Sequence, residues 1–136
     1  MKEQYLLIVL HRILSTVDRR TARLAAEAGL TLSQFSVLEA LLSKGDMTVG
    51  EVKQAVLSSD GTIPVVVRNL EKEGCLVRKA DPSDRRRCIL SITPQGRSRV
   101  GPVCEKNLAM IRETFSVWTD GEQRALARLL RKFPRD

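Results

Sequence analysis

The sequence predicts a mainly α-helical protein with a small β-hairpin, and three observations predict this class. Threonine-led capping signals mark four helix starts. Glycines follow three of the segments whose apolar residues recur with helical spacing. Two short runs of apolar and β-branched residues flank a segment that contains proline and aspartate, which form turns. The chain has 136 residues, enough for one compact domain and marginal for two.

Three of the helix starts are capping boxes. In each, a threonine hydroxyl accepts a hydrogen bond from a backbone amide three residues later, and a Glu or Gln side chain accepts one in return. The boxes are Thr31-Leu32-Ser33-Gln34, Thr48-Val49-Gly50-Glu51 and Thr119-Asp120-Gly121-Glu122. The fourth start, Thr93-Pro94, places a proline at the first helical position, where its missing N–H costs nothing.

These starts, together with stops at Gly29, Gly45 and Gly74, predict six helices. The helices are expected at about Glu3 to Ala28, Leu32 to Ser43, Val49 to Val56, about Thr62 to Glu73, Pro94 to about Val117, and Asp120 to Lys132. The first helix has one apolar face, which carries Leu6, Leu10, Ile13, Leu14 and Val17. We expect Gly101-Pro102 to bend or interrupt the fifth helix.

A two-stranded hairpin is expected from Cys75 to Lys79 and from Cys88 to Ile92. We expect Lys79 to lie opposite Cys88 and Cys75 opposite Ile92. The tip then carries Asp81-Pro82-Ser83-Asp84-Arg85-Arg86-Arg87, with Asp84 paired to a neighbouring arginine. This register separates Cys75 from Cys88 by roughly 13 Å at the usual rise of a strand, which is too far for a disulfide.

The fourth helix contains an unfavourable run, Val65-Val66-Val67, because β-branched residues are poor helix formers. We still expect a helix, since Arg68 to Glu73 continues with helix-forming residues and Gly74 follows as a stop. Pro64 must lie in the first turn, where it breaks no hydrogen bond. The expected core face carries Ile63, Val66, Val67 and Leu70, and the outward face carries Thr62, Val65, Arg68 and Asn69.

A short capped helix, a second helix and a basic hairpin follow one another in the order of a winged helix-turn-helix. Such a fold places its second helix in the DNA major groove and the hairpin, called the wing, on the neighbouring backbone or minor groove. A net charge of +7 and a pI of about 9.8 agree with a polyanionic partner.

Two groups of side chains can contact DNA. On the fourth helix, Arg68 can bind guanine and Asn69 adenine, whereas Val65 can only touch a thymine methyl group. At its start, Ser58, Ser59, Gly61 and Thr62 offer hydroxyls and backbone amides to a phosphate, with a plain helix cap as the alternative. In the wing, one of Arg85, Arg86 and Arg87 would enter a narrow minor groove while the others bind phosphates. A solvated charged turn is the alternative interpretation of the wing.

Other functional classes have little support. No apolar run approaches the roughly 20 residues of a membrane span, and no signal-peptide cleavage pattern is present, so we expect a cytoplasmic protein without a membrane partner. Cys75, Cys88 and Cys104 lack metal-ligand spacing, and His11 is the only histidine. No catalytic motif is present, so the sequence predicts neither a catalytic site nor a cofactor.

Taken together, these features resemble those of the multiple antibiotic resistance regulator (MarR) family of bacterial transcription factors. The residues that carry the resemblance are Leu32-x-x-Phe35-x-x-Leu38, Thr48-Val49-Gly50-Glu51-Val52, Val67-x-x-Leu70-Glu71-x-x-Gly74, Asp84-Arg85-Arg86-Arg87 and Ile92-Thr93-Pro94-Gln95-Gly96. Asp84 and Arg86 match the family's wing pair, and Ser59, Thr62 and Val65 match its recognition-helix positions. The chain departs from the peroxide-sensing branch, which uses a cysteine in the first helix, because it has no cysteine before Cys75.

The resemblance implies a homodimer that binds a pseudo-palindromic operator, usually as a repressor. It also implies release from DNA by a small phenolic or other aromatic effector. We therefore expect one domain over residues 1–136, in which 1–29 and 94–136 form dimerisation helices and 30–93 form the DNA-binding lobe.

The predicted function is sequence-specific binding of double-stranded DNA by a dimeric transcriptional regulator. The candidate DNA-binding residues are Ser58, Ser59, Gly61, Thr62, Val65, Arg68, Asn69, Arg85, Arg86 and Arg87, with Asp84 supporting the wing. Two alternatives stay open: a winged-helix module with architectural or protein-interaction duties and no ligand control, and a small α-helical enzyme.

Overall fold

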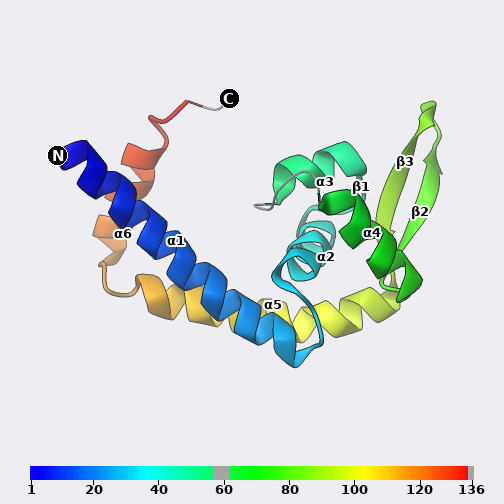
Figure 1. Cartoon of the computed structure of the whole chain (residues 1–136), viewed down its shortest axis with the longest axis horizontal. Coiled ribbons are helices and arrows are strands. Elements are labelled where there is room, and N and C mark those ends of the chain that lie inside the picture. The colour runs from blue at the N-terminus through cyan, green and yellow to red at the C-terminus, as the bar shows by residue number, and fades with distance from the viewer. Residues whose placement is uncertain (57–61, 135–136) are drawn as a thin grey trace.

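The computed structural model describes residues 1–56 and 62–134, which form a mainly α-helical fold with a small antiparallel sheet (Figure 1). The elements are α1 (Lys2–Glu27), α2 (Leu32–Lys44), β1 (Met47–Thr48), α3 (Val49–Ala55), α4 (Ile63–Lys72), β2 (Leu76–Asp81), β3 (Asp84–Ile92), α5 (Pro94–Phe115) and α6 (Asp120–Leu130). The predicted fold class is confirmed, and the described helices begin and end within about two residues of the expected positions.

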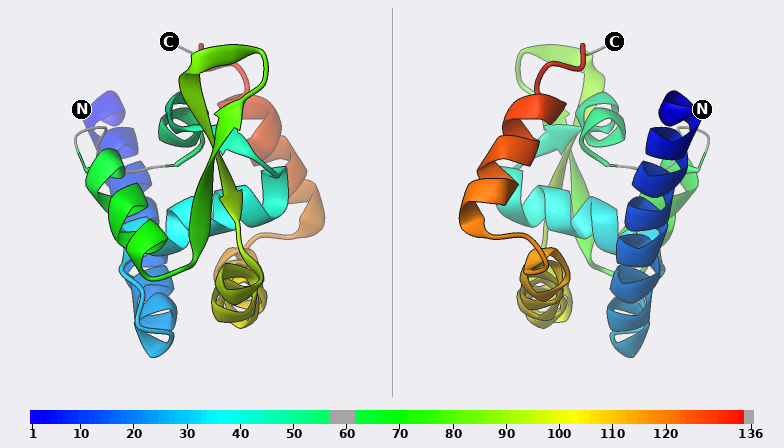
Figure 2. Two further views of the ribbon diagram at one scale, coloured as in Figure 1. Left: turned by 90° about the vertical axis from the view of Figure 1, so that its right-hand side faces the viewer. Right: turned by 90° about the vertical axis from the view of Figure 1, so that its left-hand side faces the viewer.

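The helices form two groups. Helices α2, α3 and α4 pack with the sheet into one lobe, from which the β2–β3 ribbon projects (Figure 1). The long helices α1 and α5 pack against each other, and α5 also packs against α2. Helix α6 stands apart from α1 in both views of Figure 2. The lobe therefore packs on one end of the long helices, and at the other end α1 and α6 are separated.

The predicted threonine caps are all present. Thr31, Thr48 and Thr119 each accept a hydrogen bond from the backbone amide three residues later, and a Gln or Glu side chain accepts one from the threonine amide. Thr93 caps α5 by accepting from the Gly96 amide at 3.0 Å. Each such cap stabilises its helix by about 1 kcal/mol, so these four starts are fixed locally.

The prolines fall where helices tolerate them, with one correction. Pro64 lies in the first turn of α4, as expected. Of the bend or interruption expected at Gly101-Pro102, the interruption is wrong, because α5 continues from Pro94 to Phe115 with Pro102 inside it, and the bend stays a prediction. Val100 and Val103 are buried on either side of this proline. Their burial holds the two halves of the helix in place although Pro102 donates no backbone hydrogen bond.

The sheet differs from the expected hairpin in three ways. It has three strands in the order β1-β3-β2, and the two-residue strand β1 was not predicted. Leu76 pairs with Ile92 and Ala80 with Cys88, so the predicted register is wrong by one residue. The strands extend to Asp81 and from Asp84, which leaves only Pro82 and Ser83 in the turn. Arg85, Arg86 and Arg87 therefore lie on β3 beside the turn and not in the tip itself.

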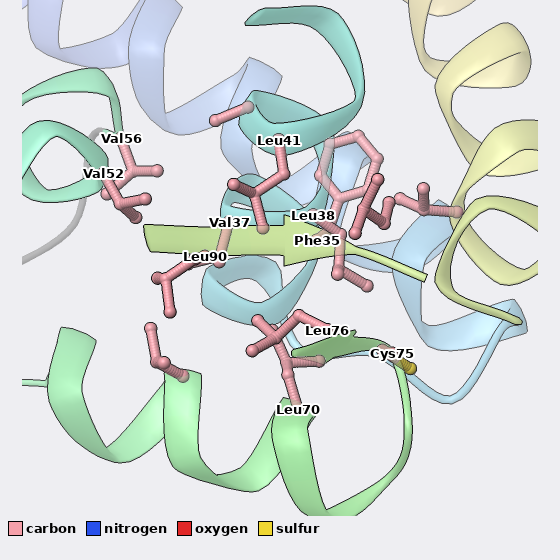
Figure 3. Packing of buried hydrophobic residues seen from close by; sticks show 14 of the residues in the cluster. Phe35, Val37, Leu38, Leu41, Val52, Val56, Leu70, Cys75, Leu76 and Leu90 are labelled. Atoms are coloured by element: carbon pink, nitrogen blue, oxygen red, sulfur yellow. The ribbon is translucent and has the colours of Figure 1, made fainter. Parts of the chain in front are cut away.

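The hydrophobic core lies between α2, α4 and the sheet (Figure 3). Leu38 and Leu41 of α2 meet Leu70 of α4 and Leu76 and Leu90 of the sheet, and all five side chains are fully buried. Burying a leucine contributes about 1.5–3 kcal/mol. The core thus fixes the orientation of α4 about its own axis and holds the base of the ribbon against it.

The N-terminal half of α1 is largely left uncovered by the residues that the structure describes. Leu6, Leu10 and Leu14, which belong to its predicted apolar face, are 59%, 44% and 57% exposed. The C-terminal half is different, since Thr21 and Ala25 are buried against the rest of the molecule. An amphipathic helix that leaves its apolar face open lacks the burial that normally stabilises it.

Among the glycines that the structure describes, Gly96 has the tightest surroundings: a Cβ atom there would overlap the Cys75 carbonyl oxygen and come within 2.9 Å of Ile92 Cγ1. We expect Gly96→Ala to lower the free energy of unfolding by about 1–3 kcal/mol, because the Cys75 backbone cannot move away without disturbing the core. Urea denaturation followed by circular dichroism measures the change.

Gly101→Ala is the matched control, because nothing lies within 4 Å of the Cβ position at Gly101 in the same helix. This variant should be neutral or more stable by up to about 1 kcal/mol, since alanine favours helix over glycine. Equal stability of the two variants would show that the contact at Gly96 is not strained.

Candidate nucleic-acid interface

Helix α4 has one buried face and one exposed face, as expected. Ile63, Val67 and Leu70 are fully buried, and Val66 is half-buried. On the opposite face Thr62, Val65, Arg68 and Asn69 are exposed, with Val65 51% exposed. About half of the Val65 surface is therefore open to solvent on this face. The predicted partition of α4 is therefore confirmed, whereas Ser58, Ser59 and Gly61 lie outside the described residues.

The three wing arginines are exposed, and Arg86 and Arg87 lie beside acidic partners on the same ribbon. Asp84 Oδ1 accepts a hydrogen bond from the Arg86 backbone amide at 3.0 Å and lies 3.5 Å from Arg86 Nε. Asp84 Oδ2 lies 3.6 Å from Arg87 Nε. The Arg86 side chain is nonetheless 93% exposed. Asp84 thus holds the backbone beside the turn and leaves the Arg86 side chain open to solvent. The predicted pairing of Asp84 with a neighbouring arginine is confirmed.

Asp81 fixes the turn itself, and the sequence analysis missed it. Its Oδ1 accepts hydrogen bonds from the Ser83 amide at 2.9 Å and the Ser83 hydroxyl at 2.7 Å. Its Oδ2 lies 3.6 Å from Arg87 Nε. The Ser83 hydroxyl and amide, helped by Arg87, hold the pKa of Asp81 below its usual value. The signal was present in the sequence, since an aspartate two residues before a serine is typical of a side-chain-stabilised turn.

The wing is also tied to α4. Arg78 Nε of β2 donates a hydrogen bond to Glu71 Oε1 of α4 at 3.1 Å. Half-exposed ion pairs contribute little stability on their own. This one nevertheless helps to fix how α4 is oriented on β2, against which it packs. The exposed face of α4 and the wing therefore belong to one rigid part of the lobe (Figure 1).

Arg99 of α5 connects the lobe to the long helices. Its Nε donates to the Ala28 carbonyl at 3.0 Å and its Nη2 to the Gly29 carbonyl at 2.9 Å, which satisfies the end of α1. Its Nη1 donates to Glu73 Oε1 at 3.3 Å and contacts Cys75 Sγ at 3.5 Å, at the end of α4. One guanidinium thus links the C-terminal ends of α1 and α4.

A cavity of about 400 Å³ opens between α2, α3 and α5. Its walls include Phe35, Glu39, Val56, Cys104, Asn107 and Ile111. Burial, with a smaller effect of the Glu39 charge, raises the pKa of the Cys104 thiol to about 11. Asn107 Oδ1 accepts a hydrogen bond at 2.7 Å from the buried Thr21 hydroxyl of α1. The cavity therefore lies where the lobe meets the long helices.

Other kinds of site are not seen in the part of the chain that the structure describes. Residues 1–56 and 62–134 contain no group of three or more His, Cys, Asp or Glu side chains arranged to hold a metal ion. Their three cysteines are free: Cys75 is buried, Cys88 exposed and Cys104 half-buried. None of their helices is long and apolar enough to cross a membrane.

The sequence matches the family model of the MarR family over residues 28–87. It is also 31% identical to the HTH-type transcriptional regulator MhqR of Bacillus subtilis, over 96% of this chain and 90% of MhqR. The chain belongs to the MarR family. The winged helix-turn-helix predicted from the order of helices and ribbon is therefore confirmed, and the chain's relatives are transcriptional regulators.

Two solved structures are similar to this chain over most of its length. BpsR of Bordetella bronchiseptica, whose DNA binding is regulated by 6-hydroxynicotinic acid, is 29% identical. Its structure superimposes with a TM-score of 0.73 over 91% of this chain and 89% of BpsR. A cysteine-to-serine mutant of MarR from Escherichia coli, in complex with operator DNA, is 22% identical, with a TM-score of 0.80 over 93% of this chain and 91% of MarR. The likeness to MarR, at 22% identity, shows that the two proteins share a fold.

The lowered pKa of Asp81 predicts how the wing responds to acid. A carboxyl group whose pKa is lower in the folded state adds stability above its unfolded pKa, and that stability is lost as the pH falls through the folded pKa. We expect Asp81 to titrate below the ordinary aspartate value of about 3.9 in an NMR titration. We also expect Asp81→Ala to speed hydrogen exchange at the Ser83 amide at neutral pH. An ordinary pKa, or unchanged exchange in the variant, would contradict this description of the turn.

Proposed function

We propose that this MarR-family protein is a dimeric, sequence-specific DNA-binding transcriptional regulator that acts as a repressor and is released from DNA by a small ligand. The observation that carries the proposal is the joint presentation of two features on one rigid lobe. These features are the exposed face of α4 and the arginines of the wing. In this proposal the protein is not an enzyme and works in the cytoplasm, where its DNA target lies.

Helix α4 would enter the major groove with its exposed face toward the bases. Arg68 and Asn69 carry the groups that bind guanine and adenine, and Val65 can pack on a thymine methyl group. Thr62, with Ser58, Ser59 and Gly61 before it, would contact phosphates near the helix start. This surface offers few hydrogen bonds to bases, so DNA shape would supply part of the specificity.

Arg86 would enter the minor groove beside the α4 site, while Arg85 and Arg87 bind phosphates. Its side chain is 93% exposed, compared with 58% for Arg87, which also lies beside Asp81 and Asp84. Asp84 holds the Arg86 backbone in place, so DNA binding would cost little backbone conformational entropy at Arg86. The described geometry thus favours Arg86 for the deepest contact.

The dimer would form from the long helices, within residues 1–29 and 94–136, and the lobe of residues 30–93 would bind DNA. The exposed apolar side chains of α1 and α6 support this division. They include Tyr5, Leu6, Leu7, Leu10, Leu14, Leu129 and Leu130. Monomeric proteins rarely expose such faces to water. A two-fold axis between two copies would place the two α4 helices about 34 Å apart, one turn of DNA.

The cavity between α2, α3 and α5 would hold the effector, because it adjoins both the lobe and the long helices. A ligand shifts a conformational equilibrium only if it binds one state better than the other. A cavity at this junction changes shape when the lobes move relative to the dimer helices. Ligand binding there can therefore disfavour the spacing that fits DNA.

We expect Arg86→Ala to weaken operator binding by about 10-fold to 100-fold, because a minor-groove arginine contributes both charge and shape readout. The slope of log affinity against log salt should also fall by about 1. Fluorescence anisotropy with a DNA fragment that the protein selects from genomic DNA measures both quantities. Circular dichroism and gel filtration should show an unchanged fold and oligomeric state.

Arg112→Ala is the matched control, because Arg112 is an exposed arginine near the C-terminal end of α5, at the other end of that helix from the wing. It removes the same charge from the whole protein and should leave affinity nearly unchanged. If both variants weaken binding equally, the wing acts only through net charge and its proposed position in the groove is wrong.

A further inference from the structure

Helices α1 and α4 end in the same way, and both ends meet one side chain of α5. At the end of α1, Gly29 has a φ of +71° and the Leu30 amide donates to the Ala25 carbonyl at 3.0 Å. Gly74 has the same role at the end of α4, with a φ of +76°. A helix end of this kind turns the chain away and leaves carbonyl oxygens that other groups must satisfy.

The side chain that meets both ends is Arg99. Its Nε and Nη2 atoms donate to the Ala28 and Gly29 carbonyls at the end of α1. Its Nη1 atom donates to Glu73 and contacts Cys75 at the end of α4. A helix C-terminus carries a partial negative charge, so a cation between two of them is stabilised by both. All the nitrogen atoms of the guanidinium are thus engaged, and the side chain is only 25% exposed.

The helix that carries Arg99 is itself fixed on the end of α4. Helix α5 runs from the end of α4 past the end of α1 (Figure 1). Gly96, about one turn before Arg99, lies so close to the Cys75 carbonyl that a Cβ atom would overlap it. The Thr93 hydroxyl donates to the Gly74 carbonyl at 2.6 Å. The start of α5 is therefore held against α4, and Arg99 connects this fixed position to the end of α1.

The packing of α2 on α1 and α5 is of another kind, because its buried part is apolar. Ala25 and Val100 of the long helices belong to the same hydrophobic core as Phe35 and Leu38 of α2. Hydrophobic contact is non-directional, so it holds helices together without fixing their angle closely. The guanidinium is a planar group whose N–H bonds point in fixed directions. Arg99 therefore adds the directional part of the contact between the lobe and α1.

We propose that Arg99 sets the spacing between DNA half-sites that the dimer accepts. The inference rests on the proposed function, in which the two α4 helices lie about one DNA turn apart. One base pair inserted between the half-sites moves them about 3.4 Å apart and rotates them by about 35°. A dimer whose α4 helices are held at a fixed angle to α1 cannot follow both changes and loses part of its DNA contact. Arg99 is a positioning residue, since it acts through α4.

Three DNA sites test the proposal: the natural site, and the same site with one base pair inserted or removed at its centre. A fragment that the protein retains from genomic DNA supplies the natural site, and fluorescence anisotropy measures each affinity. We expect the unmodified protein to bind both altered sites at least about 30-fold less tightly, because one half-site is lost or strained. In Arg99→Lys and Arg99→Gln this ratio should fall to about 5-fold or less, because the directional hydrogen bonds are gone.

The lysine variant separates direction from charge. Lysine keeps a positive charge between the two helix ends, but its ammonium group cannot form the same planar fork. If Arg99→Lys keeps the spacing selectivity of the unmodified protein, charge alone is enough and the proposal is wrong. A ratio of affinities measured on one preparation does not depend on the fraction of folded protein. A loss of stability by itself therefore cannot produce the expected result.

Arg97→Lys is the matched control, because Arg97 is an exposed arginine two residues before Arg99 on α5. Its side chain makes no hydrogen bond or ion pair with a residue that the structure describes, so this variant should keep the selectivity. Equal loss of selectivity in Arg97→Lys and Arg99→Lys would overturn the proposal. Selectivity that survives in both Arg99 variants would also overturn it and would leave the proposed function standing. An unmodified protein without any spacing preference would contradict the dimeric function and the inference together.

The distance between the two wings of the dimer tests the same claim without DNA. Cys88 is exposed on β3 and can carry a nitroxide label, and Cys104→Ser removes a second, half-buried thiol. Double electron–electron resonance then measures the distribution of distances between the two labels. We expect a broader distribution in Arg99→Lys than in the protein with Arg99, because the lobe is held at a less definite angle. Equal widths would overturn the proposal.

Discussion

The arrangement of the molecule depends on one close-packed junction, where α4 ends and α5 begins. Gly74 ends α4 with a φ of +76°, which a side chain would strain, and the next residue, Cys75, returns its amide to the Leu70 carbonyl at 2.9 Å. The Cys75 carbonyl accepts the Thr93 amide at 3.0 Å and lies against Gly96. The Thr93 hydroxyl donates to the Gly74 carbonyl at 2.6 Å. These contacts join α4, the base of the wing and the long helix α5 at one point.

Arg99 extends the same junction to α1, because its guanidinium donates to two carbonyls at the end of that helix and to Glu73 at the end of α4. A change in the angle between α1 and α5 must therefore move the end of α4 or break these hydrogen bonds. The cavity between α2, α3 and α5 is lined by Asn107 of the same helix α5. Through Asn107 and Thr21, a ligand would act on the α1–α5 contact from one side while Arg99 holds it from the other. Effector control would then need no contact between ligand and DNA.

The parts of this structure that could be predicted are those with strong local signals. Capping boxes at Thr31, Thr48 and Thr119 fix helix starts within a few residues of sequence, and the period of apolar residues in α4 fixes its buried face. The one-residue error in register arose because β2 and β3 are exposed on both faces over much of their length, so no buried face specifies the register there. It was settled by Asp81, whose side chain closes a turn of only two residues. Strand β1 has two residues, too few for any pattern to predict, and the cavity between α2 and α5 exists only once these two helices, far apart in the sequence, lie opposite each other.

The central claim is that α4 and the wing bind adjacent grooves and that symmetry repeats this contact. Hydroxyl-radical footprinting on a genomic DNA fragment that the protein retains tests it most directly. The account predicts two protected segments related by two-fold symmetry, with centres about 34 Å apart along the duplex, and protection of the flanking minor grooves that is lost without the wing arginines. A single protected segment, or weak protection spread evenly along the fragment, would contradict it.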